Sequence, residues 1–262
     1  MIAVTAITQG CGASATSPGR TLRIYTPPGF DGSGRAAYPV LVMLDGQNLF
    51  ATSRAGAMGT WAVDETMDRL IRERAIPPWI VVGLDHRHGA RIADDSPWAD
   101  PRIAMTPRGV EEAAFIATDL LDWIGANLPA HATARALVGS SLGGLLALYV
   151  AWRHPDAFER VGALSPSVMW SSGELSRHWT TRAASPRRLY LDAGEEERFD
   201  AGAFTLDYGD AARDFAAHLR GLGYGDDALR VVLEPGGTHD EASWGRRFGP
   251  AARWLLAERF RG

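Results

Sequence analysis

Short runs of apolar and β-branched residues recur along the chain, and each is closed by Gly, Pro, Asp or Ser. Runs of this length between turn-forming residues are typical of buried β-strands. The pattern therefore predicts strands at residues 21–26, 38–44, 79–84, 136–138, 160–164, 189–191 and 229–233.

Between most of these runs, apolar residues recur three and four positions apart, which is the spacing of one face of an α-helix. Helices are expected at residues 63–74, 110–127, 142–153, 211–221 and 251–260. Alternating strands and helices indicate an α/β protein, with a mostly parallel sheet and helices on both faces. The first two strands differ, because Asp31-Gly32-Ser33-Gly34 leaves no room for a crossover helix between them. We expect those two strands to form an antiparallel N-terminal hairpin.

Three stretches show neither periodicity and are long for connecting loops, namely residues 48–59, 86–108 and 166–186. Long irregular segments in a compact fold are commonly lids or binding loops. Each follows a predicted strand, so all three are expected at the carboxyl edge of the sheet, where open α/β folds bind ligands. No repeat or linker divides the chain. We predict one domain over residues 1–262, in which residues 1–20 are an N-terminal strand and loop.

Composition and charge narrow the choice of partners. The 27 basic and 31 acidic residues give a formal net charge of −4, so neither nucleic acid nor a membrane surface is an expected partner. The single cysteine, Cys11, excludes an intrachain disulfide and a multi-cysteine metal site. Residues 1–7 are apolar but lack the basic residues and the length of a secretory signal. A cytoplasmic location is therefore expected, with export as the alternative.

The strongest chemical signal is Gly139-Ser140-Ser141-Leu142-Gly143, a G-x-S-x-G sequence between a predicted strand and a predicted helix. This context is that of the nucleophile elbow of α/β-hydrolases, in which a tight turn projects the serine above the sheet edge. The flanking glycines remove side chains that would collide in such a turn. Ser141 is the predicted nucleophile, and Ser140 is its neighbour.

A serine hydroxyl needs a base within hydrogen-bond reach, and the base needs a third group to orient it. In α/β-hydrolases these follow along the chain in the order Ser, acid, His. His239 lies in a loop directly after the last predicted strand, and is the predicted base. The other histidines after Ser141 fall at a helix end, within a helix, or ahead of any acid after the next strand; they are His154, His218 and His178.

The acid is expected directly after the strand at residues 189–191. Asp192, Glu195, Glu196 and Glu197 all stand there, and the residues alone do not choose among them.

Ester hydrolysis also needs two backbone N–H groups that stabilise the oxyanion formed when the serine attacks. One is expected from Leu142, which follows the nucleophile. The other should come from the loop after an earlier strand, which here is Leu44-Asp45-Gly46-Gln47. Gly46 allows the backbone to turn toward the reacting centre.

Four ordered motifs together resemble the putative-esterase (esterase-D-like) family of α/β-hydrolases, which includes enterochelin, feruloyl and acetyl-xylan esterases and the mycolyltransferases. The motifs are Leu44-Asp45-Gly46-Gln47-Asn48-Leu49-Phe50, Val138-Gly139-Ser140-Ser141-Leu142-Gly143-Gly144, Leu164-Ser165-Pro166-Ser167 and Gly236-Gly237-Thr238-His239-Asp240. The similarity runs from about residue 21 to the C-terminus. The resemblance implies that Gln47 donates the second oxyanion N–H. It also implies that Glu197, three residues after Gly194, is the acid.

Other residues are candidates for binding roles. His86 and His88 form an H-x-H pair, but no clear third ligand accompanies them, so lining of the active-site mouth is favoured over a metal site. Trp98 and Trp170 lie in predicted mouth loops and are candidate substrate-binding residues. No cofactor is expected.

The sequence thus predicts a serine esterase that hydrolyses a small-molecule carboxylic ester through an acyl-enzyme. Two alternatives stay open: an acyltransferase of the same fold, and a non-catalytic binding module that has kept the fold.

Overall fold

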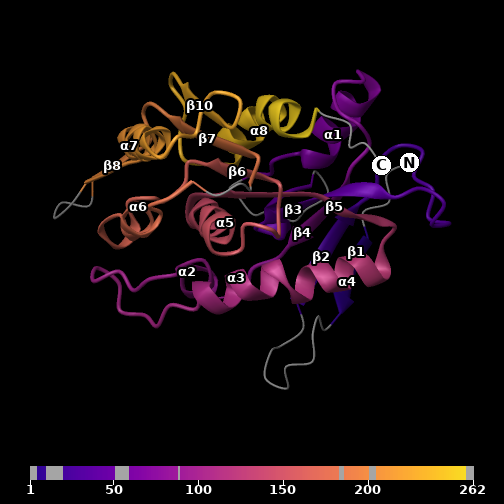
Figure 1. Cartoon of the computed structure of the whole chain (residues 1–262), viewed down its shortest axis with the longest axis horizontal. Coiled ribbons are helices and arrows are strands. Elements are labelled where there is room, and N and C mark those ends of the chain that lie inside the picture. The colour runs from indigo at the N-terminus through magenta and orange to yellow at the C-terminus, as the bar shows by residue number, and fades with distance from the viewer. Residues whose placement is uncertain are drawn as a thin grey trace.

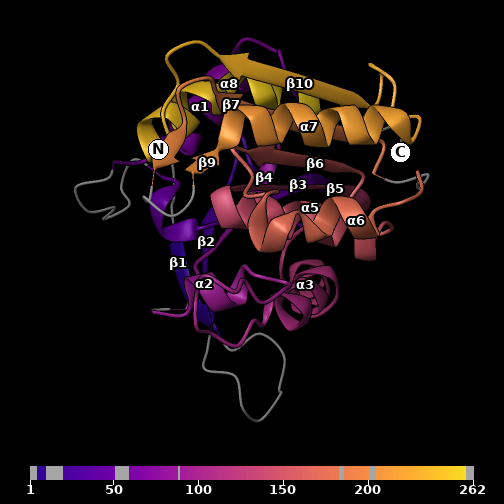
Figure 2. The same cartoon turned by 90° about the vertical axis from the view of Figure 1, so that its left-hand side faces the viewer.

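An eight-stranded mixed sheet organises the chain (Figure 1), as seen in a computed structural model that describes residues 5–9, 20–50, 59–87, 89–182, 186–200 and 205–257. The strand order is β1-β2-β4-β3-β5-β6-β7-β10, so the sheet runs from β1 at one end to β10 at the other (Figure 2). The strands are β1 (Thr5–Gln9), β2 (Arg20–Tyr25), β3 (Tyr38–Leu44), β4 (Ile80–Leu84), β5 (Ala130–Ser140), β6 (Arg160–Leu164), β7 (Arg188–Gly194) and β10 (Leu229–Glu234).

The six strands from β4 to β10 in this order are parallel, and β2 runs antiparallel to both β1 and β4. The mostly parallel α/β fold and the antiparallel N-terminal hairpin are therefore confirmed. The expected pairing of the strands at 21–26 and 38–44 is wrong, because β2 pairs with β1 and β4, whereas β3 lies between β4 and β5. The connection at residues 26–37 is long enough to pass over one neighbouring strand, since strands lie only about 5 Å apart.

Helices cover both faces of the sheet, as expected (Figure 1). One core contains side chains of α3 (Gly109–Ala117), α4 (Asp119–Asn127), α5 (Ser141–Arg153) and α7 (Tyr208–Gly221). The opposite core contains side chains of α1 (Val63–Arg72) and α8 (Glu241–Leu256). Successive strand residues point to alternate faces, so Leu189 and Leu191 of β7 enter the first core and Tyr190 enters the second.

Two predicted helices differ from those observed. The helix expected at 110–127 is interrupted at Thr118, which separates α3 from α4. The helix expected from residue 251 begins ten residues earlier, at Glu241, where the Asp240 side chain accepts a hydrogen bond from the N–H of Ser243 at 2.8 Å. Pro250 lies inside this helix. A proline usually interrupts a helical pattern, and here it concealed the first part of α8.

Short elements occupy segments that were expected to be irregular. They are η1 (Gly46–Asn48), α2 (Arg91–Asp94), η2 (Trp170–Ser172) and α6 (Glu174–His178). A separate antiparallel ribbon, β8 (Arg198–Asp200) and β9 (Thr205–Asp207), follows β7 and was not expected. Within the described ranges, no helix has the length and apolar character needed to cross a membrane.

Candidate active site

Ser141 lies where β5 ends and α5 begins, at the carboxyl edge of the parallel strands. Its φ angle is +55°, which is a left-handed conformation that non-glycine residues adopt rarely. The turn is so tight that a Cβ on Gly139 would stand 2.4 Å from the carbonyl oxygen of Gly143. The local geometry is thus that of a nucleophile elbow, with the serine at the positive end of a 13-residue helix.

Three of the predicted site residues meet at this edge. The Oγ of Ser141 lies 2.9 Å from Nε2 of His239, and Nδ1 of the same ring lies 3.2 Å from Oε2 of Glu197. His239 comes from the loop between β10 and α8, and Glu197 from the turn after β7. Ser141 and Glu197 are 56 positions apart in the chain, and Glu197 and His239 are 42 positions apart. The three side chains nevertheless form one continuous line of hydrogen bonds.

The four candidate acids, Asp192 within β7 and Glu195, Glu196 and Glu197 in the turn after it, have different surroundings. Glu197 is 2% exposed and is the one of the four that contacts His239 within the described residues. Glu195 and Glu196 face solvent. Asp192 is fully buried, and its Oδ1 lies 3.2 Å from Nε of Arg247.

Neighbouring positive charge and burial have opposite effects on the pKa values of the two buried acids, Asp192 and Glu197. Burial alone would raise the pKa of Glu197, but the hydrogen bonds from His239 and Ser165 and the charge of Arg247 together hold the pKa below its usual value. Burial raises the pKa of Asp192 to about 7, although Arg247 opposes the rise. Glu197 is therefore the acid that stays ionised as the pH falls.

Aromatic side chains surround the imidazole of His239. Its ring centroid lies 4.1 Å from that of Tyr208, 4.9 Å from that of Trp244 and 5.4 Å from that of Phe199. Phe199 is 46% exposed and extends from β8. None of the three was a predicted site residue, because nothing in the local pattern indicates which side chains will reach a loop far along the chain.

The histidine loop packs directly on the end of β7. A Cβ on Gly194 would stand 2.1 Å from the carbonyl oxygen of Gly237, so no larger residue fits at that point without movement of the backbone. This close approach fixes the distance between the strand that leads to Glu197 and the loop that carries His239.

The two predicted oxyanion donors lie in the first turns of two helices. Leu142 is the second residue of α5, and Gln47 is the second residue of η1. N–H groups at such positions have no acceptor within their own helix. The loop that carries Gln47 is anchored by Asp45, whose carboxylate accepts two hydrogen bonds of 2.7 Å from Arg91. A Cβ on Gly143 would lie 3.3 Å from Oδ2 of Asp45, which places this loop against the first turn of α5.

Trp98 and Trp170 lie beside each other, since the indole N–H of Trp170 donates to the carbonyl oxygen of Trp98 at 3.0 Å. The Trp98 ring packs edge-on against Tyr149, with centroids 5.2 Å apart. Tyr149 follows Ser141 by eight residues, or about 12 Å along α5. Trp98 thus packs well down the helix from Ser141, and a substrate-binding role for these two residues stays a prediction.

The predicted histidine pair gives no metal site within the described part of the chain. Nδ1 of His86 lies 3.1 Å from the carbonyl oxygen of Arg87, and His88 is outside the described residues. Across the described ranges, no three His, Cys, Asp or Glu side chains are grouped as metal ligands.

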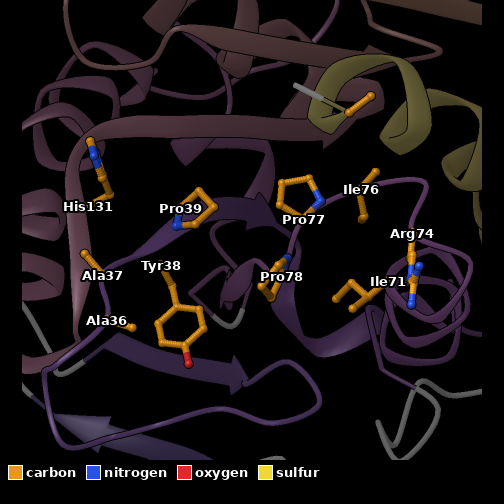
Figure 3. A pocket seen from close by; sticks show the side chains of 11 residues that line it. Ala36, Ala37, Tyr38, Pro39, Ile71, Arg74, Ile76, Pro77, Pro78 and His131 are labelled. Atoms are coloured by element: carbon orange, nitrogen blue, oxygen red, sulfur yellow. The ribbon is translucent and has the colours of Figure 1, made fainter. Parts of the chain in front are cut away.

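The structure also contains a cavity of about 690 Å³. Figure 3 shows the side chains that line it. Its lining includes the first residues of β3, Tyr38 and Pro39, and also Pro77, Pro78 and His131. These residues mark the amino ends of β3, β4 and β5, whereas Ser141 follows the carboxyl end of β5. The cavity is therefore separate from the candidate active site.

Comparison with known proteins assigns the chain to a family. Ferri-bacillibactin esterase BesA of Bacillus subtilis is 28% identical over 71% of this chain and 69% of its own length. Siderophore hydrolase EstA from Aspergillus nidulans superimposes with a TM-score of 0.69 and 21% identity, over 96% of this chain and 91% of that one. An IroE-like serine hydrolase from Shewanella oneidensis has a TM-score of 0.72 and 22% identity, over 94% and 78%. The family model described as Putative esterase matches residues 13–255. The chain belongs to the putative-esterase family of α/β-hydrolases.

Proposed function

We propose that this protein is a serine esterase that hydrolyses carboxylic esters of small molecules through an acyl-enzyme. The observation that carries the proposal is the line of hydrogen bonds from Glu197 through His239 to Ser141, at 3.2 and 2.9 Å. Nucleophile, base and orienting acid then stand in the order that serine hydrolysis requires. Membership of an esterase family supports ester hydrolysis as the reaction class.

In the first half of the reaction, Oγ of Ser141 attacks the acyl carbon while Nε2 of His239 accepts the hydroxyl proton. The negative charge that develops on the carbonyl oxygen is stabilised by the backbone N–H groups of Leu142 and Gln47 and by the positive end of α5. The ester C–O bond then breaks. His239 passes its proton to the departing alcohol, which leaves an acyl-serine.

Water completes the cycle. It attacks the acyl carbon, gives a proton to His239 and forms a second tetrahedral intermediate. The bond to Oγ of Ser141 breaks, His239 returns its proton to the serine, and the carboxylic acid leaves. Glu197 stays ionised throughout and stabilises the imidazolium that forms in each half.

The relatives suggest a substrate type. BesA acts, by its name, on ferri-bacillibactin, and EstA is called a siderophore hydrolase. We infer that the substrate here is likewise a small molecule that carries an ester bond. The ring of Phe199, which is 46% exposed and lies beside His239, offers such a molecule an aromatic surface next to the reacting atoms.

A fluorophosphonate probe tests the proposal directly. The wild-type protein should be labelled and should hydrolyse p-nitrophenyl acetate, and Ser141→Ala should lose both properties while its far-UV circular dichroism is unchanged. Ser140→Ala is the matched control and should be labelled. If Ser140→Ala abolishes labelling and Ser141→Ala does not, the nucleophile is wrong; if the wild type itself neither reacts nor turns over ester, the proposed function fails. Transfer of the acyl group to added glycerol in preference to water would favour the acyltransferase alternative.

A further inference from the structure

A buried hydroxyl group stands behind the carboxylate of Glu197, on the side opposite His239. Ser165 follows the last residue of β6, is fully buried and has a φ angle of +43°. Strained backbone of this kind persists where the surroundings hold it, and it is concentrated at functional sites. The Oγ of Ser165 lies 2.8 Å from Oε1 of Glu197.

Two further side chains fix the direction of that hydrogen bond. The indole Nε1–H of Trp244 donates to Oγ of Ser165 at 3.0 Å, and Nη2 of Arg247 donates to it at 2.6 Å. Indole and guanidinium groups only donate, so they occupy both acceptor positions of the hydroxyl. The single hydroxyl hydrogen of Ser165 must therefore point to Oε1 of Glu197.

The same assignment of donors and acceptors determines the roles of the Glu197 oxygens and the tautomer of His239. Oε1 of Glu197 receives the hydroxyl of Ser165 and, at 2.8 Å, Nη2 of Arg247. A carboxylate in this position acts as an acceptor at both oxygens, so Oε2 faces the Nδ1–H of His239. Nε2 of His239 then has a free lone pair directed at the hydroxyl of Ser141, which is the tautomer that a general base requires.

We propose that Ser165, Trp244 and Arg247 form a carboxylate clamp, in which Ser165 and Arg247 are positioning residues that hold Glu197 ionised and rotated toward His239. The clamp acts on the reaction through Glu197 and does not touch the substrate. This inference rests on the proposed function, because it assigns a role relative to the same three reacting residues.

The position of Arg247 suits this role. It is 4% exposed and lies on α8, whose first turn follows the loop that carries His239. Its guanidinium group lies 2.8 Å from Glu197, 3.2 Å from Asp192 and 3.5 Å from Glu234. One buried cation therefore faces three carboxylates from β7, the turn after it, and β10. Nη2 of Arg247 donates to both Ser165 and Glu197, and Nε of the same guanidinium group forms an ion pair with Asp192.

Ser165→Ala tests the clamp without changing the charge of the site. The expected result is a loss in kcat of about 10- to 100-fold, which is the size expected for one hydrogen bond to a charged group, with KM for p-nitrophenyl acetate unchanged. Ser96→Ala is the matched control, because Ser96 is also fully buried and its hydroxyl has no hydrogen-bond partner within the described residues. It should leave kcat near the wild-type value. Arg247→Lys, which keeps the charge and loses the fork, should follow Ser165→Ala.

The double variant Ser165→Ala, Glu197→Gln separates positioning from a general structural role. If the clamp acts through the charge of Glu197, the double variant should be no slower than Glu197→Gln alone. Losses that multiply would overturn the proposal, as would a Ser165→Ala protein with wild-type kcat.

A readout that needs no turnover keeps the test independent of the esterase assignment. The proton NMR signal of the His239 Nδ1–H should change its chemical shift in Ser165→Ala and stay in place in Ser96→Ala. An unmoved signal in Ser165→Ala would refute the clamp. A wild type that is neither labelled by the phosphonate nor able to turn over ester would refute the proposed function, and the NMR signal would still decide on the clamp.

Discussion

Replacing Glu197 by Gln should reduce kcat by roughly 10⁴-fold, although the side chain keeps its shape. The lost interaction is that between the carboxylate and the imidazolium of His239, whose atoms are 3.2 Å apart. At an effective dielectric constant of about 20, two unit charges at this distance attract by about 5 kcal/mol. A change of 1.36 kcal/mol in the barrier is one factor of ten in rate, so the loss approaches four decades. The size agrees with that of the corresponding change in the serine-protease triad.

The surroundings of Glu197 also determine how the amide side chain of the Glu197→Gln variant would sit. The two donors at Oε1, from Ser165 and Arg247, require an oxygen at that position. The amide NH₂ would then face Nδ1 of His239 and donate to it, so the ring would carry its proton on Nε2. That nitrogen could no longer accept the proton of Ser141.

Steady-state hydrolysis of p-nitrophenyl acetate measures the effect, and thermal unfolding shows whether the variant is intact. Glu196→Gln is the control, because Glu196 is exposed in the same turn, and it should be near wild type. Near wild-type kcat in Glu197→Gln, together with a crippled Asp192→Asn or Glu195→Gln, would refute the assignment of the acid.

Three further results are expected. His239→Ala should lose most of the rate of ester hydrolysis, because Nε2 of the imidazole lies 2.9 Å from Oγ of Ser141 and is placed to accept its proton; a His239→Ala protein with near wild-type kcat would count against a histidine base. Because folding raises the pKa of Asp192 to about 7, its ionisation costs stability as the pH rises from about 4 through 7, so the Tm of Asp192→Asn relative to wild type should increase over that window. Gly194→Ala should lower kcat by about 100-fold and destabilise by about 1–3 kcal/mol, because its Cβ would meet the carbonyl oxygen of Gly237 at 2.1 Å and move the histidine loop, and wild-type values in both assays would contradict this packing argument.

The parts of this protein that the sequence predicted well are those encoded locally. β3 and β6 have the predicted bounds, because each is a continuous apolar run closed by Asp or Ser. The turn at Ser141 was likewise identifiable from five adjacent residues and the elements on either side. The order of strands in the sheet depends on contacts between residues far apart in the chain. The pairing of β2 with β4, in which Tyr25 lies opposite Val81, could therefore not be predicted from the loop that follows β2.

The acid shows where local pattern stops and long-range contact begins. Alternation along β7 puts Asp192 on the same face as Tyr190, toward α8, and away from the edge where His239 lies. Because β7 extends to Gly194, beyond the predicted end at residue 191, Asp192 belongs to the strand and is turned into the packing of the sheet. The sequence pattern could not indicate that a cation lies on the same face. Arg247 belongs to the first part of α8, which was not predicted because Pro250 interrupts the helical pattern. Arg247 in turn gives Asp192 a partner and lends a donor to Glu197, so one side chain 50 residues beyond the turn separates the roles of the two acids.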